Sequence, residues 1–228
     1  MSAPLSIVIP TLNAADRLGP CLGALAPALT SGLIRELILA DGGSEDAIAE
    51  VAEALGARLI TAERGRGQQL AAGAEAALGD WLLFLHADTV LPTGWEEMVR
   101  SHIQTHPDRA GHFALRFDSA HPMARVTEGW ANLRSFAFAL PYGDQALLVP
   151  QILYRRVGGY PPIPLMEDVA LMRRIGRGNL RRLPGRVVTS AERYERDGWL
   201  RRGWRNLTTL ALYTAGRDPA QLVDRYRR

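Results

Sequence analysis

Short apolar runs alternate with helix-like segments in the first part of this chain, and this rhythm limits the available folds most strongly. The apolar runs occupy residues 5–10, 34–40, 57–61 and 81–85. Segments with Ala and Leu at helical spacing fill the intervals at residues 16–29, 45–55 and 68–78. Such alternation is typical of βαβ units, whose strands run parallel in one sheet. The sequence therefore predicts an α/β fold.

The rhythm changes after residue 92. The spacing predicts helices over 93–104, 123–139 and 167–174, strands over 112–117 and 146–149, and an amphipathic helix over 199–215. The HFALRF run at 112–117 alternates as in an antiparallel or mixed sheet, and Trp130, Leu133 and Phe136 share one face of the second helix. A chain of 228 residues with 47% apolar residues can bury one core. We expect a single domain with a mixed, mostly parallel sheet and a C-terminal helical extension.

The charged residues exclude several kinds of chemistry. All 27 cationic side chains are Arg, so the chain has no phosphate-binding lysine, no lysine Schiff base and no lysine nucleophile. Residues 173–228 carry 15 Arg against 5 acidic residues, whereas residues 1–172 carry 12 against 19. The basic end favours an anionic partner or a membrane surface, or else it is a solvated Arg-rich helix. The single Cys21, in an apolar helical stretch, is expected to be a buried thiol.

Polar motifs follow the predicted parallel strands at their carboxyl ends, where open α/β sheets bind ligands. The residues concerned are Pro10, Thr11 and Asn13, then Asp41 and Gly43, then Arg66 and Gly67, and finally His86, Ala87 and Asp88. The Arg-Gly loop at the start of a helix suits a diphosphate, and one carboxylate beside a diphosphate suits Mg²⁺ or Mn²⁺. These motifs predict a nucleotide site at one sheet edge.

Each motif also has a purely structural interpretation. Asp88 could cap a helix that begins near residue 93. Ser44 could cap the helix that follows the turn at residues 41–46. Glu167 and Asp168 complement the dipole of the helix that they begin. Asp144, within the segment Gly143, Asp144 and Gln145, lies either in an acceptor site or in an ordinary turn.

Taken in order, the motifs SIVIPTLN, LADGGSED, the Arg-Gly loop, FLHADT, GDQALLV and MEDVALMRRI resemble family-two glycosyltransferases with the glycosyltransferase A-type, Rossmann-like fold. The branch most similar to this chain is the radical-SAM/selenodomain-associated transferase 2 group. The resemblance covers essentially the whole chain. It implies an inverting, metal-dependent transfer of a sugar from a nucleotide-sugar donor to a small-molecule or lipid-linked acceptor. It divides the chain into a nucleotide-binding half (1–92), an acceptor-binding half (93–190) and an Arg-rich extension (191–228).

Carried over by position, the resemblance assigns the residues to roles. The metal ligands are Asp88 and His86, and the catalytic pair consists of Asp168, as general base, and Glu167. The acceptor contacts are Gly143, Asp144, Gln145 and Tyr160. The nucleotide contacts are Pro10, Thr11, Asn13, Asp41, Gly43, Arg66, Gly67 and Ala87. Two positions depart from the family pattern. His86 replaces a first carboxylate, so it is either a metal ligand or a neutral ribose contact, and Ala71 replaces a frequent Asn.

Two other functions are compatible with parts of the sequence. A sugar nucleotidyltransferase normally has a Gly-rich first loop and a Lys, which this chain lacks, and a non-catalytic protein would use the Arg-rich end to bind anions or a membrane surface. Nucleic acid is disfavoured because the aromatics do not interleave with a continuous basic groove. Packing is the expected role of Trp130, Trp199, Trp204 and Tyr142. The expected location is cytoplasmic, with peripheral membrane contact through the helix at 199–215.

Overall fold

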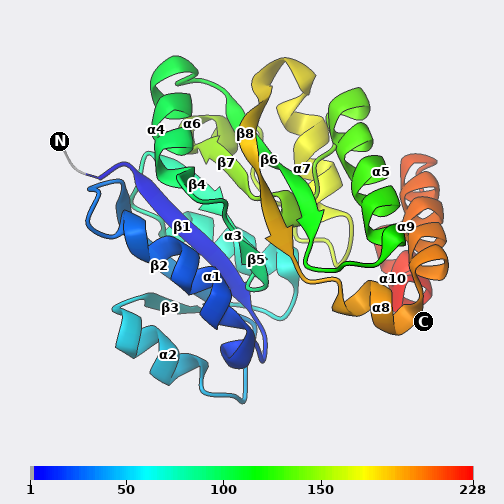
Figure 1. The fold of residues 1–228 in the computed structure, drawn as a ribbon, viewed down its shortest axis with the longest axis horizontal. Helices are drawn as coiled ribbons and strands as arrows, with labels where there is room; N and C mark the ends of the chain where they lie inside the picture. Colours follow the sequence, from blue (N-terminus) through cyan, green and yellow to red (C-terminus); the bar gives the residue numbers. More distant parts are fainter. Residues whose placement is uncertain (1–2, 228) are drawn as a thin grey trace.

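A mixed sheet forms the centre of the computed structural model, which describes residues 3–227 (Figure 1). Its order is β3-β2-β1-β4-β7-β6-β8-β5. The strands are β1 (Leu5–Thr11), β2 (Ile34–Asp41), β3 (Arg58–Thr61), β4 (Trp81–Phe84), β5 (Thr89–Val90), β6 (Ala110–Phe117), β7 (Leu147–Pro150) and β8 (Leu180–Thr189). The strands β1 to β4 are parallel, whereas β7 is antiparallel to β4 and β5 is antiparallel to β8. The mixed, mostly parallel sheet agrees with the sequence prediction.

Helices cover both faces of this sheet. They are α1 (Leu18–Leu25), α2 (Ile48–Leu55), α3 (Arg66–Ala76), α4 (Trp95–Thr105), α5 (Pro122–Phe138), α6 (Gln151–Arg156), α7 (Glu167–Ile175), α8 (Glu192–Asp197), α9 (Trp199–Thr214) and α10 (Pro219–Arg227), with 3-10 turns η1 (Ala15–Arg17), η2 (Ala26–Ala28), η3 (Gly143–Gln145) and η4 (Arg177–Asn179). Successive side chains of β1 alternate between two hydrophobic cores. Ile7 and Ile9 belong to the core that includes α1 and α4, and Val8 belongs to the core that includes α3 and α7.

Several elements differ from the sequence prediction. The expected helix over 16–29 is split into η1, α1 and η2, and the expected helix over 45–55 begins only at Ile48. The strand β8 was not expected, because Arg181, Arg182 and Pro184 interrupt its apolar alternation. The short elements β5, α6, α8 and α10 were also missing from the prediction. Within residues 3–227, no helix combines the length and apolar character needed to cross a bilayer.

Two capping hypotheses are wrong. The N-cap of α4 is Gly94, and no side chain caps this helix, so Asp88 does not begin it. Ser44 does not cap α2, whose N-cap is Ala47; instead the Ser44 hydroxyl donates to Asp41 and accepts from the Asn13 backbone N–H. Both side chains therefore serve the loops at the sheet edge rather than a helix terminus.

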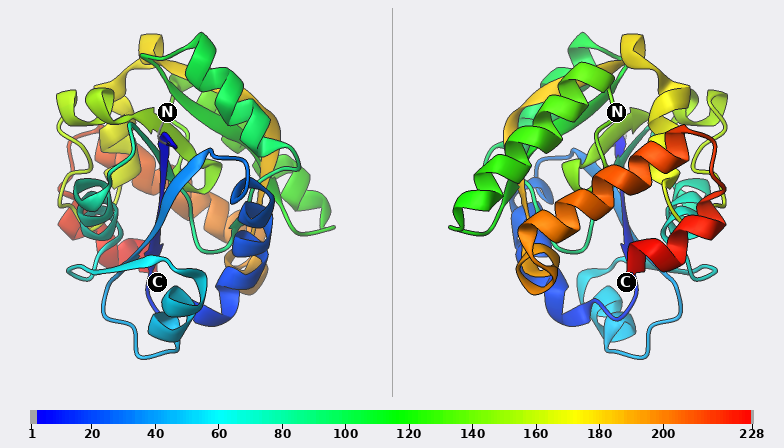
Figure 2. Two further views of the ribbon diagram at one scale, coloured as in Figure 1. Left: turned by 90° about the vertical axis from the view of Figure 1, so that its left-hand side faces the viewer. Right: turned by 90° about the vertical axis from the view of Figure 1, so that its right-hand side faces the viewer.

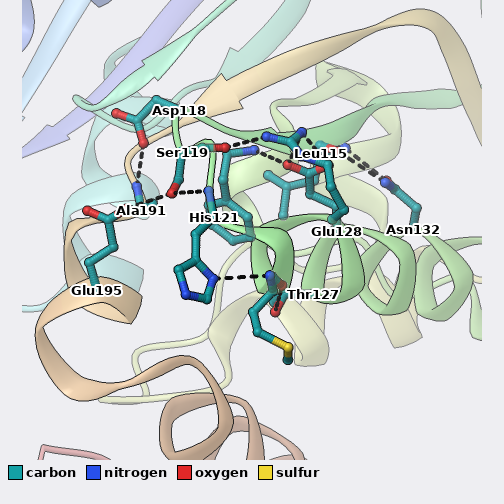
Figure 3. Close-up of polar contacts among 12 residues, drawn as sticks. Leu115, Asp118, Ser119, His121, Thr127, Glu128, Asn132, Ala191 and Glu195 are labelled. Carbon is teal, nitrogen blue, oxygen red and sulfur yellow. Dashed lines mark hydrogen bonds and ion pairs between the residues drawn. The ribbon is translucent and has the colours of Figure 1, made fainter.

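The long helix α5 has an unusual polarity. Its buried residues include Glu128, Arg134 and Ser135, whereas Trp130 and Phe136 are exposed, so the expected packing of Trp130 is wrong. The polar face is needed inward because it bonds to the part of β6 that its short pairing with β7 leaves unpaired, as Figure 3 shows. Asn132 accepts from the Leu115 N–H and donates to its carbonyl, and Glu128 accepts from the Phe117 N–H at 2.7 Å. Covering these unpaired backbone groups of β6 in this way leaves the apolar face of α5 outside.

Candidate functional site

A cleft of about 1040 Å³ opens at the carboxyl ends of β1 and β4. The starts of α3 and α7, the turn η3 and residues of α8, α9 and α10 complete its walls. Of the residues singled out from the sequence, the following line it: Pro10, Thr11, Asn13, Arg66, His86, Ala87, Asp88, Tyr142, Gly143, Asp144, Glu167 and Asp168. The structure therefore brings the motifs of both halves of the chain to one place.

The loops after β1 and β2 are held together by a network centred on Asp41. Its carboxylate accepts hydrogen bonds from the Thr11 hydroxyl at 3.0 Å and from the Gly43 and Ser44 backbone N–H groups at 2.9 and 2.8 Å. Burial raises the pKa of Asp41, but these bonds and the Ser44 hydroxyl outweigh it, so the pKa stays below its usual value. Asp41 and Gly43 lie outside the cleft lining, and they shape the loop that carries it.

Asn13 joins the two loops directly. Its φ of 49° lies in the left-handed region, which Asn tolerates better than most side chains. Its N–H donates to Ser44 Oγ at 2.8 Å, and its side-chain oxygen accepts from the Glu45 N–H at 2.9 Å. Gln69 of α3, which sequence reasoning missed, donates to the carbonyls of Thr11 and Ala40. These bonds fix one rim of the cleft against α3.

The opposite rim brings His86, Gly143 and Asp168 into contact. The Gly143 N–H donates to Asp168 Oδ2 at 3.0 Å. A Cβ atom at Gly143 would lie 2.5 Å from His86 Nε2 and 3.0 Å from Asp168 Oδ2, so only glycine fits between them. Three buried side-chain atoms here have no hydrogen-bond partner among the described residues: His86 Nε2, Asp144 Oδ1 and Asp168 Oδ1. Buried polar atoms without partners are costly, and they mark a place for a ligand.

Burial and mutual repulsion control the charges at this rim. Burial, increased by the neighbouring Asp168 and opposed by Arg66, raises the pKa of Glu167 to about 7. Burial also raises the pKa of Asp168, although Arg66 opposes this effect. For Asp144, burial raises the pKa to about 6 against the attraction of Arg134. Glu167 and Asp144 are therefore poised to exchange protons near neutral pH.

Arg66 supplies the opposing positive charge at the start of α3. Its Nη1 lies 3.9 Å from Glu167 Oε1, and its guanidinium remains partly exposed to the cleft. Burial lowers the pKa of Arg66, but Glu167 and Asp168 more than compensate and raise it. Burial and the nearby Arg66 and Arg193 lower the pKa of His86 well below its usual value, so its imidazole is neutral. A neutral imidazole beside Arg66 is compatible with metal ligation.

The side chains at the cleft suit a cation that takes most of its ligands from a bound phosphate and from water. Among residues 3–227, no group of three or more His, Cys, Asp or Glu side chains is arranged to hold a metal. Asp88 offers one carboxylate to the cleft, and His86 offers an unpartnered nitrogen. Hard divalent cations bind with one or two protein carboxylates when phosphate and water oxygens supply the rest. The donor set thus fits a cation shared with a phosphorylated ligand.

Some predicted residues lie behind the cleft lining. The side chain of Gln145 is fully buried and accepts from Ser135 while it donates to the Phe113 carbonyl. Tyr160 packs edge-on against Phe84 and lines a small cavity beside Asp168. Gly67 is packed so closely that a Cβ there would lie 2.8 Å from the Pro161 carbonyl oxygen. These three residues support the wall of the cleft.

The C-terminal helices add residues that the sequence motifs did not indicate. Arg193 of α8, Arg202 of α9 and Tyr226 of α10 all line the cleft. The guanidinium of Arg202 lies 4.5 Å from the centre of the Tyr226 ring and 3.4 Å from Asp197. Only the excess of Arg in residues 173–228 pointed to this contribution. The cleft is therefore more basic on its C-terminal side than the four strand-end motifs suggest.

Similar solved structures share this fold. The structure of residues 1–349 of TarS from S. aureus matches with a TM-score of 0.65 and 13% identity over 98% of this chain and 69% of that one. Glucosyl-3-phosphoglycerate synthase from Mycobacterium tuberculosis, in complex with Mn²⁺, UDP-glucose and glycerol 3-phosphate, matches with a TM-score of 0.56 and 22% identity, over 78% of this chain and 69% of that one. The predicted glycosyltransferase A-type arrangement is confirmed.

Sequence comparison agrees with this result. A PGL/p-HBAD biosynthesis glycosyltransferase from Mycobacterium bovis is 41% identical over 99 residues, which span 40% of this chain and 38% of that protein. The model of glycosyl transferase family 2 matches residues 6–157, which run from β1 through the turn η3 to the end of α6. This segment contains most of the residues that line the cleft, and the chain therefore belongs to glycosyl transferase family 2.

Proposed function

We propose that this protein is an enzyme that transfers a sugar from a nucleotide-sugar donor to an acceptor hydroxyl. One observation carries the proposal: His86 Nε2, Asp144 Oδ1 and Asp168 Oδ1 are buried, with no hydrogen-bond partner in the described part of the chain, around one cleft that Arg66 also lines. A phosphorylated sugar with its cation would satisfy these groups. The membership in glycosyl transferase family 2 and the activity named for the mycobacterial relative support it.

The donor would lie along the rim formed by β1 and α3. Pro10, Thr11, Asn13 and Ala87 would face the base and ribose, and the Asp41 network, with Gly43, would keep their loops in shape. Arg66 and the N-terminus of α3 would face the diphosphate, because guanidinium groups and helix N-termini both bind phosphate oxygens. Gly67 would permit the close approach of α3 to the loop at residues 161–163.

We infer that a divalent cation, Mn²⁺ or Mg²⁺, accompanies the donor. Asp88 and His86 would hold it, with diphosphate oxygens completing the coordination. When bound, the cation would stabilise the negative charge that develops on the departing nucleoside diphosphate. The synthase from M. tuberculosis holds Mn²⁺ together with UDP-glucose, which supports Mn²⁺ as the first ion to test.

Asp168 would act as the general base. The acceptor oxygen bonds to the anomeric carbon as the bond from that carbon to the diphosphate breaks, and Asp168 takes the hydroxyl proton. Its Oδ2 accepts from the Gly143 N–H, whereas its Oδ1 has no hydrogen-bond partner within residues 3–227. A pKa raised toward the working pH improves a general base. Glu167 would balance Arg66, and Gly143, Asp144, Gln145 and Tyr160 would form or support the acceptor side.

Four finer assignments belong to this proposal. Inversion at the sugar and membership in the radical-SAM/selenodomain-associated transferase 2 branch rest on the ordered motifs of the sequence. A cytoplasmic location with peripheral contact at the inner membrane face rests on the basic C-terminal region, because the cytoplasmic leaflet carries anionic lipids. The contact would be made through α9. The division at residues 92 and 190 into donor, acceptor and C-terminal parts remains part of the proposal.

Thermal unfolding with nucleotide and metal tests the function. UDP or GDP together with Mn²⁺ is expected to raise the melting temperature of the wild-type protein, because a ligand that binds only the folded state stabilises it. The variant Asp88→Ala is expected to lose this increase. The matched control Asp108→Ala removes an exposed carboxylate that is paired only with its neighbour Arg109, and it should keep the increase.

Two results would contradict the proposal. One is a wild-type protein whose melting temperature no nucleoside diphosphate changes. The other is an Asp88→Ala variant that responds as strongly as the wild type. A positive result is followed by incubation with nucleotide sugars, one donor at a time, and measurement of the nucleoside diphosphate released.

A further inference from the structure

Exposed apolar side chains gather on two neighbouring helices. Of the thirteen large hydrophobic side chains that are exposed among the described residues, eight lie on α5 and α9. Val126, Trp130 and Leu133 of α5 follow one another at spacings of four and three residues, and Leu200, Trp204 and Leu207 of α9 repeat the same spacing. Residues at this spacing share one helix face. Each helix thus carries an apolar stripe on its exposed side.

The two helices pack against each other at the edge of the molecule. They are in direct contact, and both lie on the side that Figure 2 (right) turns toward the viewer. We call their exposed apolar residues the apolar surface; it comprises Val126, Trp130, Leu133, Phe136, Phe138, Leu200, Trp204 and Leu207. Soluble proteins rarely expose apolar side chains in such a concentration unless they bind something there.

The charge around the apolar surface selects its partner. Residues 173–228, which include α9, carry ten more positive than negative charges. Arg177 reaches the C-terminal end of α5, where it donates to the Phe136 and Ala137 carbonyls, and the exposed Arg201 lies on α9 itself. A second copy of the chain related by two-fold symmetry would bring this positive region against itself. An anionic lipid surface complements it, and Trp is favoured at such interfaces.

The apolar surface is continuous with the cleft. Trp130 and Leu207 belong to both, and Leu210 of α9 extends the apolar lining inward. Resting on this continuity and on the proposed function, we propose that α5 and α9 dock on an anionic membrane, and that the acceptor is a lipid-linked molecule whose polar head enters the cleft past Trp130 and Leu207. The bilayer then presents the acceptor at the side of the cleft opposite the β1 rim.

Flotation with vesicles tests the docking. The probe is vesicles of phosphatidylcholine and phosphatidylglycerol in equal parts, compared with phosphatidylcholine alone. Wild-type protein should float with the anionic vesicles and detach as salt rises. Leu133→Glu and Trp204→Glu should each weaken vesicle binding by about tenfold, because they place a carboxylate in the interface. Ile152→Glu is the matched control, since Ile152 is 80% exposed but lies on α6, far from both helices in Figure 1.

Quenching of tryptophan fluorescence tests the route of the acceptor. Vesicles containing a spin-labelled phosphatidylcholine should quench Trp130 and Trp204, and the variants Trp130→Phe and Trp204→Phe should each remove part of the quenching. The core residue Trp95 should remain unquenched. Loss of quenching in Trp204→Phe but not in Trp130→Phe would mean that the cleft mouth faces water, and it would overturn the lipid-linked acceptor.

The outcomes separate this inference from the proposed function. Leu133→Glu and Trp204→Glu should keep the stabilisation by nucleotide and Mn²⁺, because neither residue lines the cleft. Stabilisation by nucleotide without any flotation overturns the membrane surface alone. Flotation without nucleotide binding overturns the proposed function, and with it the acceptor. A wild-type dimer that does not float, and that Leu133→Glu converts to a monomer, would assign the surface to a second copy.

Discussion

Glu167 and Asp168 are adjacent at the start of α7 but have different partners. Glu167 lies near Arg66, and Asp168 accepts a hydrogen bond from Gly143. Neighbouring residues on a helix diverge by about 100°, which explains this separation. Burial raises the pKa of both groups, and the Asp168 charge raises the pKa of Glu167 further. The pair therefore behaves as one titrating unit at the proposed site of proton transfer.

Glu167→Gln is expected to shift the acidic limb of the activity profile to lower pH. This variant removes the carboxylate beside Arg66, so the Arg66 charge, which lowers the pKa of Asp168, acts on Asp168 alone and keeps the base ionised in more acidic solution. The measurement is kcat/KM against pH with a donor identified by screening. Glu97→Gln, at an exposed position near Arg100, should leave the limb in place. A limb that stays fixed or moves upward in Glu167→Gln would contradict this coupling.

Buried His112 is expected to make the fold sensitive to acid. Its Nδ1 lies 2.9 Å from the Phe113 carbonyl oxygen, and burial lowers its pKa to about 4 despite this bond. The unfolded chain binds the proton near pH 6.5, so the unfolded state gains protons first as the pH falls. The free energy of unfolding should therefore drop by about 3 kcal/mol between pH 7 and pH 4 through this residue.

Urea unfolding at several pH values measures this effect. His112→Gln cannot gain a proton, so its stability should decline less steeply below pH 6.5 than that of the wild type. Parallel curves for wild type and His112→Gln would show that the imidazole has the same pKa in the folded and unfolded protein, and would contradict this prediction.

The strands that the sequence predicts and the elements that it misses differ in how far they depend on tertiary contacts. Runs such as LSIVIP and WLLF are apolar enough to indicate buried strands on their own. The strand β8 is not, because only its pairing with β6 and its buried residues Leu180, Leu183 and Val187 make it a strand. The sequence likewise does not reveal which face of α5 is buried, because the inward polar face is held by hydrogen bonds to the backbone of β6.

Helix α10 is expected to strengthen nucleotide binding through Tyr226. The ring lies under the Arg202 guanidinium, and both side chains line the cleft. Tyr226→Ala should weaken the affinity for UDP with Mn²⁺ by about three- to tenfold, the usual size of such a contact. Calorimetric titration measures it. Tyr213→Ala is the matched control, because the Tyr213 ring contacts Arg173 at 5.7 Å outside the cleft lining. Equal loss in both variants would exclude a specific role for α10.

The whole sheet is expected to unfold in one step. The pairs β4–β7 and β5–β8 join residues before and after position 92 within one sheet, so neither part has a complete sheet alone. Tryptophan fluorescence and circular dichroism should give the same midpoint in urea. UDP with Mn²⁺ at a hundred times its dissociation constant should raise the free energy of unfolding by about 2.7 kcal/mol. Two separate transitions would instead indicate independent parts.

For the whole molecule, the sequence predicted the class of fold and the sheet edge that carries the site. The strand-end motifs are local, and parallel strands necessarily bring their carboxyl ends together. The contribution of Arg193, Arg202 and Tyr226 could not be read in the same way, because it depends on how α8, α9 and α10 fold back over the sheet. Gln69 was missed for the same reason, since its bonds to two loops exist only after α3 packs on β1.

The cleft also sets an order of events during synthesis. Thr11 ends the strand β1, whereas Tyr226 belongs to α10, the last helix among the described residues, and both line the same cavity. On the ribosome, β1, β2 and β4 emerge long before α10, so a growing chain carries the loops at the sheet edge without the helix that closes over them. A bound nucleotide can therefore stabilise the fold fully only after the chain has been synthesised through α10. Before that point, the fold of the unfinished chain is stabilised by its own packing.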